Sequence, residues 1–269
     1  MRQLLSRIAI FLWILFLPAF AQADELSDNR RFSKAEITNF VTELYRRNGT
    51  VAVNSPRFRK HDGYVRWTSK IVFVVDGVGP KGVERTSNLL HKVTDMLPLD
   101  IKMSQGNKVQ GANFFITFTD QYQNVSDSLY LRQMHFPLIH PDDPLIQKML
   151  VRADDKEKQV LASTIVQENG DVLASATLTV PSFSENNGFS EDAIILRSIL
   201  LGLTGGHRVI KFRESHFALT PKDRSRSELF PMDRLFLSAL YSDAIPSGIT
   251  KEQAIPLIIN QMIALQASN

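Results

Sequence analysis

The apolar run from Ala193 to Leu203 predicts a helix that is covered on several faces, because few of its residues are polar. Ser190 precedes the run as a candidate helix cap. Glu191 and Asp192 then place negative charge in the first turn, where the helix dipole favours it. The pair Gly205-Gly206 follows as a stop signal. We therefore expect this helix at the centre of a domain.

Alternating and helical patterns predict an ordered series of elements on both sides of the central helix. Ser33 and Glu36 have the spacing of a capping box and open a helix through about Arg46. The elements expected before the central helix are, in order, a strand at Lys70–Asp76, a helix at Val83–Met96, strands at Leu99–Met103 and Ala112–Thr119, a short helix at Leu145–Val151, and a hairpin of Gln159–Gln167 and Val172–Val180 around Asn169-Gly170. After it we expect helices at Phe230–Tyr241 and from Thr250 to about Gln266, the latter opened by a second capping box.

The first residues have the pattern of a secretory signal peptide. Arg2 and Arg7 precede an apolar run from Ile8 to Leu17, and Ala21-Gln22-Ala23 follows as a cleavage site of small residues. The run is shorter than the ~20 residues that span a bilayer, and no later segment reaches that length. We expect residues 1–23 to be removed after Ala23 and the mature chain to be periplasmic or secreted, without a transmembrane segment.

Composition narrows the chemistry that is open to the chain. The net charge of +3 includes Arg2 and Arg7 of the expected signal peptide, so it does not indicate nucleic-acid binding. The chain contains no cysteine, which excludes disulfides and thiolate chemistry. Any metal site would need His, Asp or Glu, and we expect no cofactor.

Candidate metal ligands are sparse and lie in predicted loops. His135 and His140, with Asp143 behind them, form the densest cluster, but their spacing and two neighbouring prolines argue against a helix that would align them. His207 and His216 lie in a second polar stretch. We interpret both stretches as solvated loops.

Other catalytic and binding motifs are incomplete. The chain has no G-x-S-x-G, and Ser198 lies inside a helix. The loop Gly77–Gly82 follows a strand and precedes a helix, but it lacks the spacing of a phosphate-binding loop, and Pro80 removes an N–H. A basic cluster interleaved with aromatic residues is best interpreted as a solvated face; it comprises Arg57, Arg59, Lys60 and Arg66 with Phe58 and Trp67.

The order of strand, helix, two strands, hairpin strand and central helix resembles that of the zincin metalloproteases. Metzincins carry H-E-x-x-H-x-x-G-x-x-H, in which histidines bind zinc and the glutamate is the base. When the pattern is placed on Gly202, Ile195 and Ile199 occupy the first two ligand positions, Leu196 the glutamate, and Gly205 the third ligand. The resemblance therefore implies a zincin scaffold in which only the glycine of the motif is kept. The stretch Phe230–Tyr241 also resembles the terminal helix of matrix-type metzincins.

A closer resemblance is to the exported bacterial proteins grouped as domain of unknown function 2927. Its motifs are Arg66-Trp67, Ala112-Asn113, Leu201-Gly202-Leu203, Asp233, Leu240-Tyr241 and Pro246-Ser-Gly248. Members usually have Glu-Glu and Gln where this chain has Ile195-Leu196 and Ile199. The resemblance implies an α+β, metzincin-type fold with a mixed twisted sheet, a central helix, a terminal helix pair and an N-terminal helix. It places the zincin-like domain at residues 65–269, after an N-terminal helix and linker at 24–64.

Two interpretations follow, from different classes of protein. The first is a non-catalytic, zincin-like protein of the cell envelope that binds another protein or a polymer. The second is a hydrolase with a relocated site built from His135, His140, His207 or His216 and nearby acids. The absence of ligands from the central helix favours the first. Its apolar side chains should then be part of a closed core, because leaving each one in water would forfeit about 1.5–3 kcal/mol.

Overall fold

The computed structural model describes residues 30–46, 51–53, 64–104, 111–118, 160–166, 172–179, 189–205, 212–218 and 221–268. The chain divides into two compact units, Met1–Ser33 and Lys34–Asn269, and the fold described below is that of the second. None of the helices in these described ranges has the length and apolar character needed to cross a membrane. The predicted signal peptide, Leu145–Val151 and the turn at Asn169-Gly170 lie outside the described residues.

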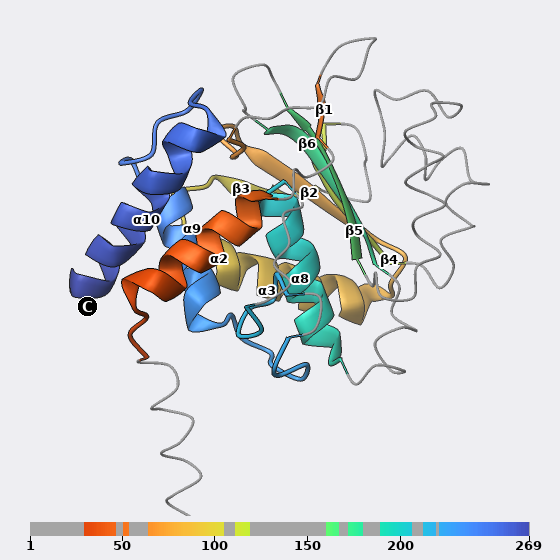
Figure 1. Cartoon of the computed structure of the whole chain (residues 1–269). Helices are drawn as coiled ribbons and strands as arrows, with labels where there is room; N and C mark the ends of the chain where they lie inside the picture. The colour runs from red at the N-terminus through yellow and green to blue at the C-terminus, as the bar shows by residue number, and fades with distance from the viewer. Residues whose placement is uncertain are drawn as a thin grey trace, which may run out of the picture. The chain divides into compact units, whose positions relative to one another are not determined.

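Six strands form one mixed sheet (Figure 1). They are β1 (Val51–Val53), β2 (Ile71–Asp76), β3 (Ile101–Met103), β4 (Phe114–Phe118), β5 (Val160–Val166) and β6 (Val172–Thr179). Their order across the sheet is β1-β5-β6-β4-β2-β3. The pair β5–β6 is antiparallel, as the hairpin pattern predicts, and the other neighbouring pairs are parallel.

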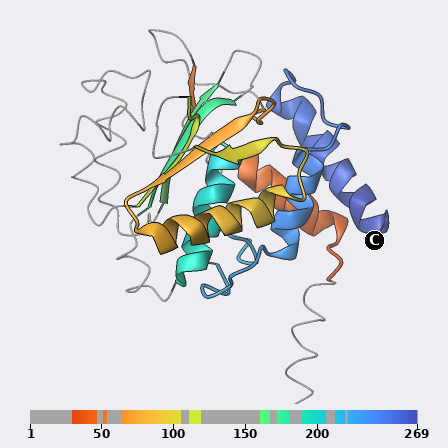
Figure 2. The ribbon, with the colours of Figure 1, turned by 180° about the vertical axis from the view of Figure 1, so that it is seen from behind.

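Five helices are described, and they make two groups. They are α2 (Lys34–Arg46), α3 (Pro80–Thr94), α8 (Glu191–Leu203), α9 (Pro231–Leu240) and α10 (Lys251–Ser268). Helices α3 and α8 contact each other and pack on one face of the sheet, α8 on β5 and β6 and α3 on β2 and β3 (Figures 1 and 2). Helix α10 packs on both α2 and α9. The coarse prediction of an α+β fold with a mixed sheet is therefore confirmed.

Local signals explain where the helices begin and end. Ser190 caps α8 through its side chain, as predicted. Thr250 and Gln253 cap α10 reciprocally, because each side chain accepts a hydrogen bond from the backbone N–H of the other. Helix α3 begins earlier than predicted, at Pro80 instead of Val83, because proline suits the first position of a helix and Gly79 supplies the extended cap.

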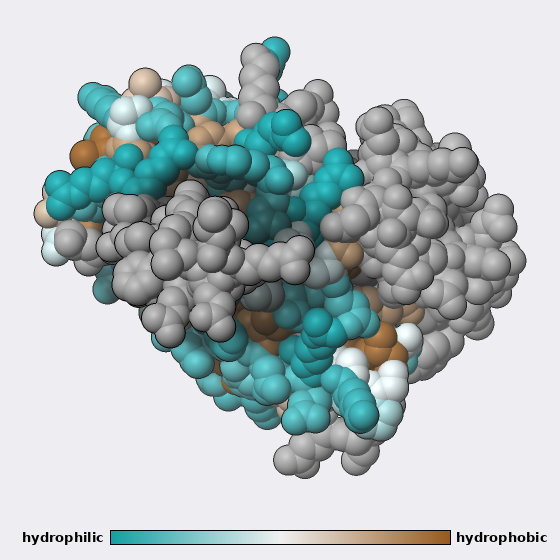
Figure 3. Space-filling model, turned by 90° about the horizontal axis from the view of Figure 1, so that it is seen from below, coloured by the Kyte–Doolittle hydropathy of each residue, from teal (hydrophilic) through white to brown (hydrophobic). Residues whose placement is uncertain are grey.

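The core is apolar and surrounds α8. All residues from Ala193 to Leu203 are buried, including the two polar residues Arg197 and Ser198. A second part of the core is aromatic, with the ring of Phe40 from α2 packed edge-on against Phe217 and Phe236. The face shown in Figure 3 is mostly hydrophilic, with small apolar areas between polar side chains. The helix that the sequence marks as central is therefore central in the structure.

Candidate functional site

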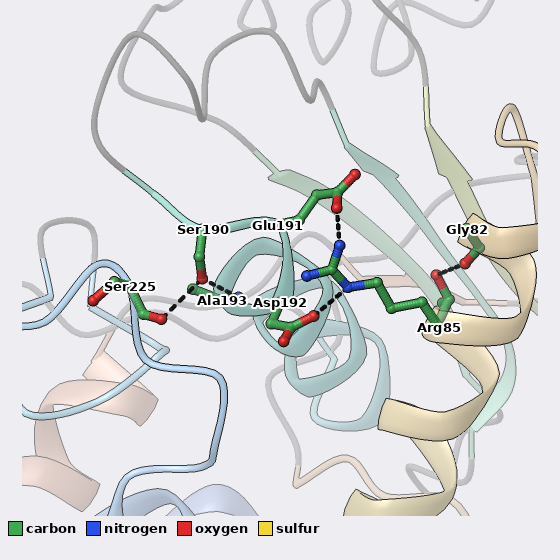
Figure 4. A network of polar contacts seen from close by, with 8 residues as sticks. Gly82, Arg85, Ser190, Glu191, Asp192, Ala193 and Ser225 are labelled. Carbon is green, nitrogen blue, oxygen red and sulfur yellow. Dashed lines mark hydrogen bonds and ion pairs between the residues drawn. The ribbon is translucent and has the colours of Figure 1, made fainter.

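The N-terminal end of α8 is held by polar contacts with its neighbours (Figure 4). Ser190 Oγ accepts a hydrogen bond from the Ala193 amide at 3.2 Å and donates one to the Ser225 carbonyl at 3.1 Å. Arg85 of α3 forms ion pairs with both acidic residues in the first turn of α8. These carboxylates occupy the positive end of the helix dipole. The end is therefore a structural contact between α3 and α8.

The ligand positions of the zincin pattern hold buried apolar side chains. Ile195, Leu196 and Ile199 expose 3%, 2% and 0% of their surface. An aliphatic side chain offers no lone pair to zinc and no group that accepts a proton from water. The expectation of a closed core at these positions is therefore confirmed by their burial.

Gly202, the glycine of the pattern, and Gly205, at its third ligand position, have structural roles. A Cβ atom added to Gly202 would lie 2.2 Å from Cε2 of Phe114, so glycine is needed where α8 approaches β4. Gly205 has a φ of +74° and ends the helix in the left-handed conformation, with Val65 beside it. Gly205 stands at the third ligand position of the pattern and likewise carries no donor side chain.

The C-terminal end of α8 is capped by side chains from distant parts of the chain. The Trp67 indole N–H donates to the Gly202 carbonyl at 3.2 Å, and the Tyr241 hydroxyl donates to the Leu203 carbonyl at 2.7 Å. Such terminal carbonyls have no partner within their own helix. Burial raises the pKa of Tyr241 far above its usual value, so this hydroxyl stays protonated and remains a donor.

Further residues that carry the family resemblance also hold the scaffold. Arg66 Nη1 donates to the Ile245 carbonyl at 2.8 Å. This bond connects the segment before β2 to the turn after α9. Asn113 Oδ1 accepts from the Val72 amide at 2.7 Å, and its Nδ2 donates to the Lys70 carbonyl at 2.9 Å. These contacts extend the pairing of β2 with β4. In this structure the motifs stabilise the fold.

A serine, a histidine and an aspartate meet at the start of α9. Asp233 is fully buried, and its carboxylate accepts hydrogen bonds from Ser215 Oγ at 2.5 Å and from the His216 amide at 2.7 Å. The His216 ring lies against Phe230 and donates from Nε2 to the Glu228 carbonyl at 2.8 Å. In a catalytic triad the serine would face the imidazole, whereas here it donates to the carboxylate. These contacts fix residues 212–218 to α9, and we call the cluster of Ser215, His216 and Asp233 the clamp.

The clamp contains two groups with strongly shifted pKa values. Burial, together with the positive charges of Arg197 and Arg226, lowers the pKa of His216 to about 4. Burial raises the pKa of Asp233 to about 7, against its two hydrogen bonds, which favour the ionised form. The imidazole is thus neutral at pH 7, and it faces the protein interior instead of a substrate.

The residues of the predicted relocated site are only partly described. His135, His140 and His207 lie outside the described residues, as do Arg57, Phe58, Arg59 and Lys60 of the basic cluster. Trp67 of that cluster is 1% exposed, so the prediction of a solvated face is wrong for this residue. His216 is described and is buried, so the prediction of a solvated loop is wrong for this residue. Its ring bonds to the Glu228 carbonyl inside the clamp, which argues against a role as a metal ligand. Within the described ranges, no group of three or more His, Asp or Glu side chains could hold a metal ion.

The loop after β2 does not form a phosphate-binding site. Since α3 starts at Pro80, the glycine-rich connection is reduced to Gly77, Val78 and Gly79. A cavity of about 30 Å³ lies behind it, floored by Phe118 and Ile195. This cavity, which holds roughly one water molecule, is too small for a phosphate group, and the larger groove that Val78 and Pro80 also line carries the acidic Glu84.

Sequence patterns missed two features of this region. Arg197 is 1% exposed, although a charged residue is almost never fully buried, and the surrounding apolar run was the only signal that it would be. The partners of Asp233 were not predicted either, because Ser215 lies in a loop with no regular pattern. Comparison of the chain with known protein families, with curated proteins and with solved structures finds no match.

Proposed function

We propose that this chain is a non-catalytic, zincin-like protein that binds a protein or a polymer of the cell envelope. The observation that carries the proposal is the burial of Ile195, Leu196 and Ile199 where a metzincin has two zinc ligands and its base. Zinc hydrolysis needs an open metal position and a group that activates water, and α8 offers neither.

The order of the elements supports the zincin-like part of the proposal. Along the chain β2, α3, β3, β4, the β5–β6 hairpin and α8 follow in the order that the resemblance implies. The contacts of Trp67 and Tyr241 with α8 give the resemblance motifs a shared physical role, which is to hold the central helix. Membership of the family of domain of unknown function 2927 is proposed on these residues.

Export to the periplasm or the medium is part of the same proposal. It rests on Arg2, Arg7, the apolar run Ile8–Leu17 and the small residues before Asp24. Intact-mass measurement of the protein from the producing cell should give a chain that begins at Asp24. A chain that keeps its leader would contradict export by cleavage.

Metal content and peptidase activity test the non-catalytic assignment. Protein purified without chelator should contain far less than one zinc per chain and should leave a mixed peptide substrate uncleaved, because α8 has no donor atoms. Elemental analysis and mass spectrometry of the peptides give the two results. About one zinc per chain that is lost in His135→Ala or His140→Ala, but kept in the control His91→Gln, would overturn the proposal in favour of the hydrolase.

A further inference from the structure

In the part of the chain that the structure describes, the sheet ends at β3, and the outer backbone groups of this strand pair with no described strand. Among the described strands β3 pairs only with β2, through the Asp100 carbonyl and the Ser104 amide, each in a bond of 2.9 Å. The directions of the backbone hydrogen-bonding groups alternate along a strand, so the N–H and C=O of Lys102 also face β2. Ile101 and Met103 therefore direct their N–H and C=O groups outward. Such an edge is a template for another extended chain.

Helix α3 and strand β3 contact each other and lie side by side in Figure 2. A groove is lined by residues of both elements. Its volume is about 560 Å³, and its apolar lining comes from Val78, Pro80, Val83 and Met103. Met103 therefore belongs to both features, since its side chain lines the groove and its backbone faces outward. A strand added to β3 would direct alternate side chains toward the groove.

Glu84 gives the groove its charge. Its side chain lines the groove, and it is exposed. The adjacent Arg85 is engaged by Glu191 and Asp192 of α8, so its guanidinium is directed to those carboxylates. A ligand with a Lys or Arg next to its apolar side chain is therefore complementary in charge.

We propose that the β3 edge and the α3–β3 groove bind an extended peptide segment of a partner protein. The segment adds as a strand beside Ile101 and Met103, places an apolar side chain in the groove, and directs a Lys or Arg toward Glu84. The inference rests on the proposed function and gives the binding module its surface and its class of ligand. The lining of the groove does not include Ile195, Leu196 or Ile199 of α8.

Hydrogen exchange on the full mature chain tests the edge itself. Without ligand, the amides of Ile101 and Met103 should exchange much faster than those of Lys102 and Ser104, which bond to β2. Equal protection of all four would overturn the proposal. Protection of the outer amides that grows with protein concentration would show that a second copy of the chain occupies the edge, and this too would overturn it.

A random octapeptide library displayed on phage is the probe for the ligand. Selected peptides should alternate apolar residues and carry Lys or Arg, and their binding should slow exchange at Ile101 and Met103. Ile101→Pro removes an outward N–H and should abolish binding. Glu84→Lys should weaken binding by up to about fivefold, the value of an exposed ion pair. The control Lys92→Glu, on a neighbouring groove of α3, should leave affinity unchanged.

The outcomes separate this inference from the proposed function. Failure to select any peptide, or binding that survives Ile101→Pro in a protein with an unchanged melting temperature, overturns the peptide site. The exchange pattern of the wild-type chain decides the matter if the proline variant does not fold. Zinc content and peptidase activity are measured on the same protein and test the non-catalytic assignment independently.

Discussion

In the zincin pattern Ile199 occupies the position of the second zinc ligand, but its aliphatic side chain cannot bind zinc. It has no exposed surface, and the residues on either side of it in α8 are buried as well. A carboxylate placed there would lose its hydration without gaining a partner, which costs several kcal/mol or shifts its pKa. The position therefore discriminates between a closed core and an open cleft.

Ile199→Asp should unfold the protein or lower its melting temperature sharply, whereas the matched variant Ile199→Val should cost only about 0.5–1.5 kcal/mol. Thermal melts of both variants measure the difference. An unchanged midpoint for Ile199→Asp would mean that the helix face is open to solvent. This face of α8 would then become the preferred binding site.

At the scale of elements, α8 is stabilised chiefly at its two ends and along its apolar sides. Its first turn uses local capping by Ser190 and the ion pairs of Arg85. Its last turn instead uses hydrogen bonds from Trp67 and Tyr241, which belong to other elements. The C-terminal end of the helix therefore depends on tertiary structure more than the N-terminal end does.

Tyr241→Phe should lower the unfolding free energy by about 1–3 kcal/mol, because the Leu203 carbonyl stays buried without its donor. Tyr64→Phe is the matched control, since it removes a comparable bond of 2.8 Å to the Leu240 carbonyl of α9. Hydrogen exchange should speed up in the last turn of α8 in the first variant only. Equal exchange of this turn in both variants would contradict the capping role.

At the scale of the whole molecule, the clamp links stability to pH in two opposing ways. The pKa of His216 is lowered to about 4, so the folded state disfavours its protonation and stability is lost as pH falls from about 6.5 toward 4. The pKa of Asp233 is raised to about 7, so the folded state holds a proton that the unfolded chain releases, and stability is lost as pH rises toward 7. Between these limits the two effects cancel, because each state binds one proton.

The contribution of the clamp to the unfolding free energy should therefore be nearly flat between pH 4.5 and 6 in the wild-type chain. Replacing His216 with Gln, which can still donate to the Glu228 carbonyl, should add a fall with rising pH of up to about 1.4 kcal/mol per pH unit. Asp233→Asn should add a rise of the same size. Urea titrations across this pH range measure the slopes relative to wild type, and parallel curves for all three proteins would exclude the linkage.

The sequence by itself determined the features that depend on near neighbours in the chain. The apolar run of α8, the cap at Ser190 and the capping box at Thr250 and Gln253 involve residues within one or two turns, so their patterns are visible in the sequence. Ile195 and Ile199 stand at the positions that the zincin pattern gives to zinc ligands, and their apolar character is likewise visible in the sequence. The proposed function rests on it.

Only the tertiary structure decided the features that join distant segments. The short strand β1 has three residues, too few for a pattern, and it forms because β5 is there to pair with it. The burial of Arg197, the Asp233–Ser215 bond and the capping of α8 by Tyr241 depend on neighbours brought together by packing; the residues joined by the last bond are 38 apart in the chain. The physical reason is that a helix or strand pattern records which face is apolar, whereas the partner of a buried polar group is set by the elements that cover it.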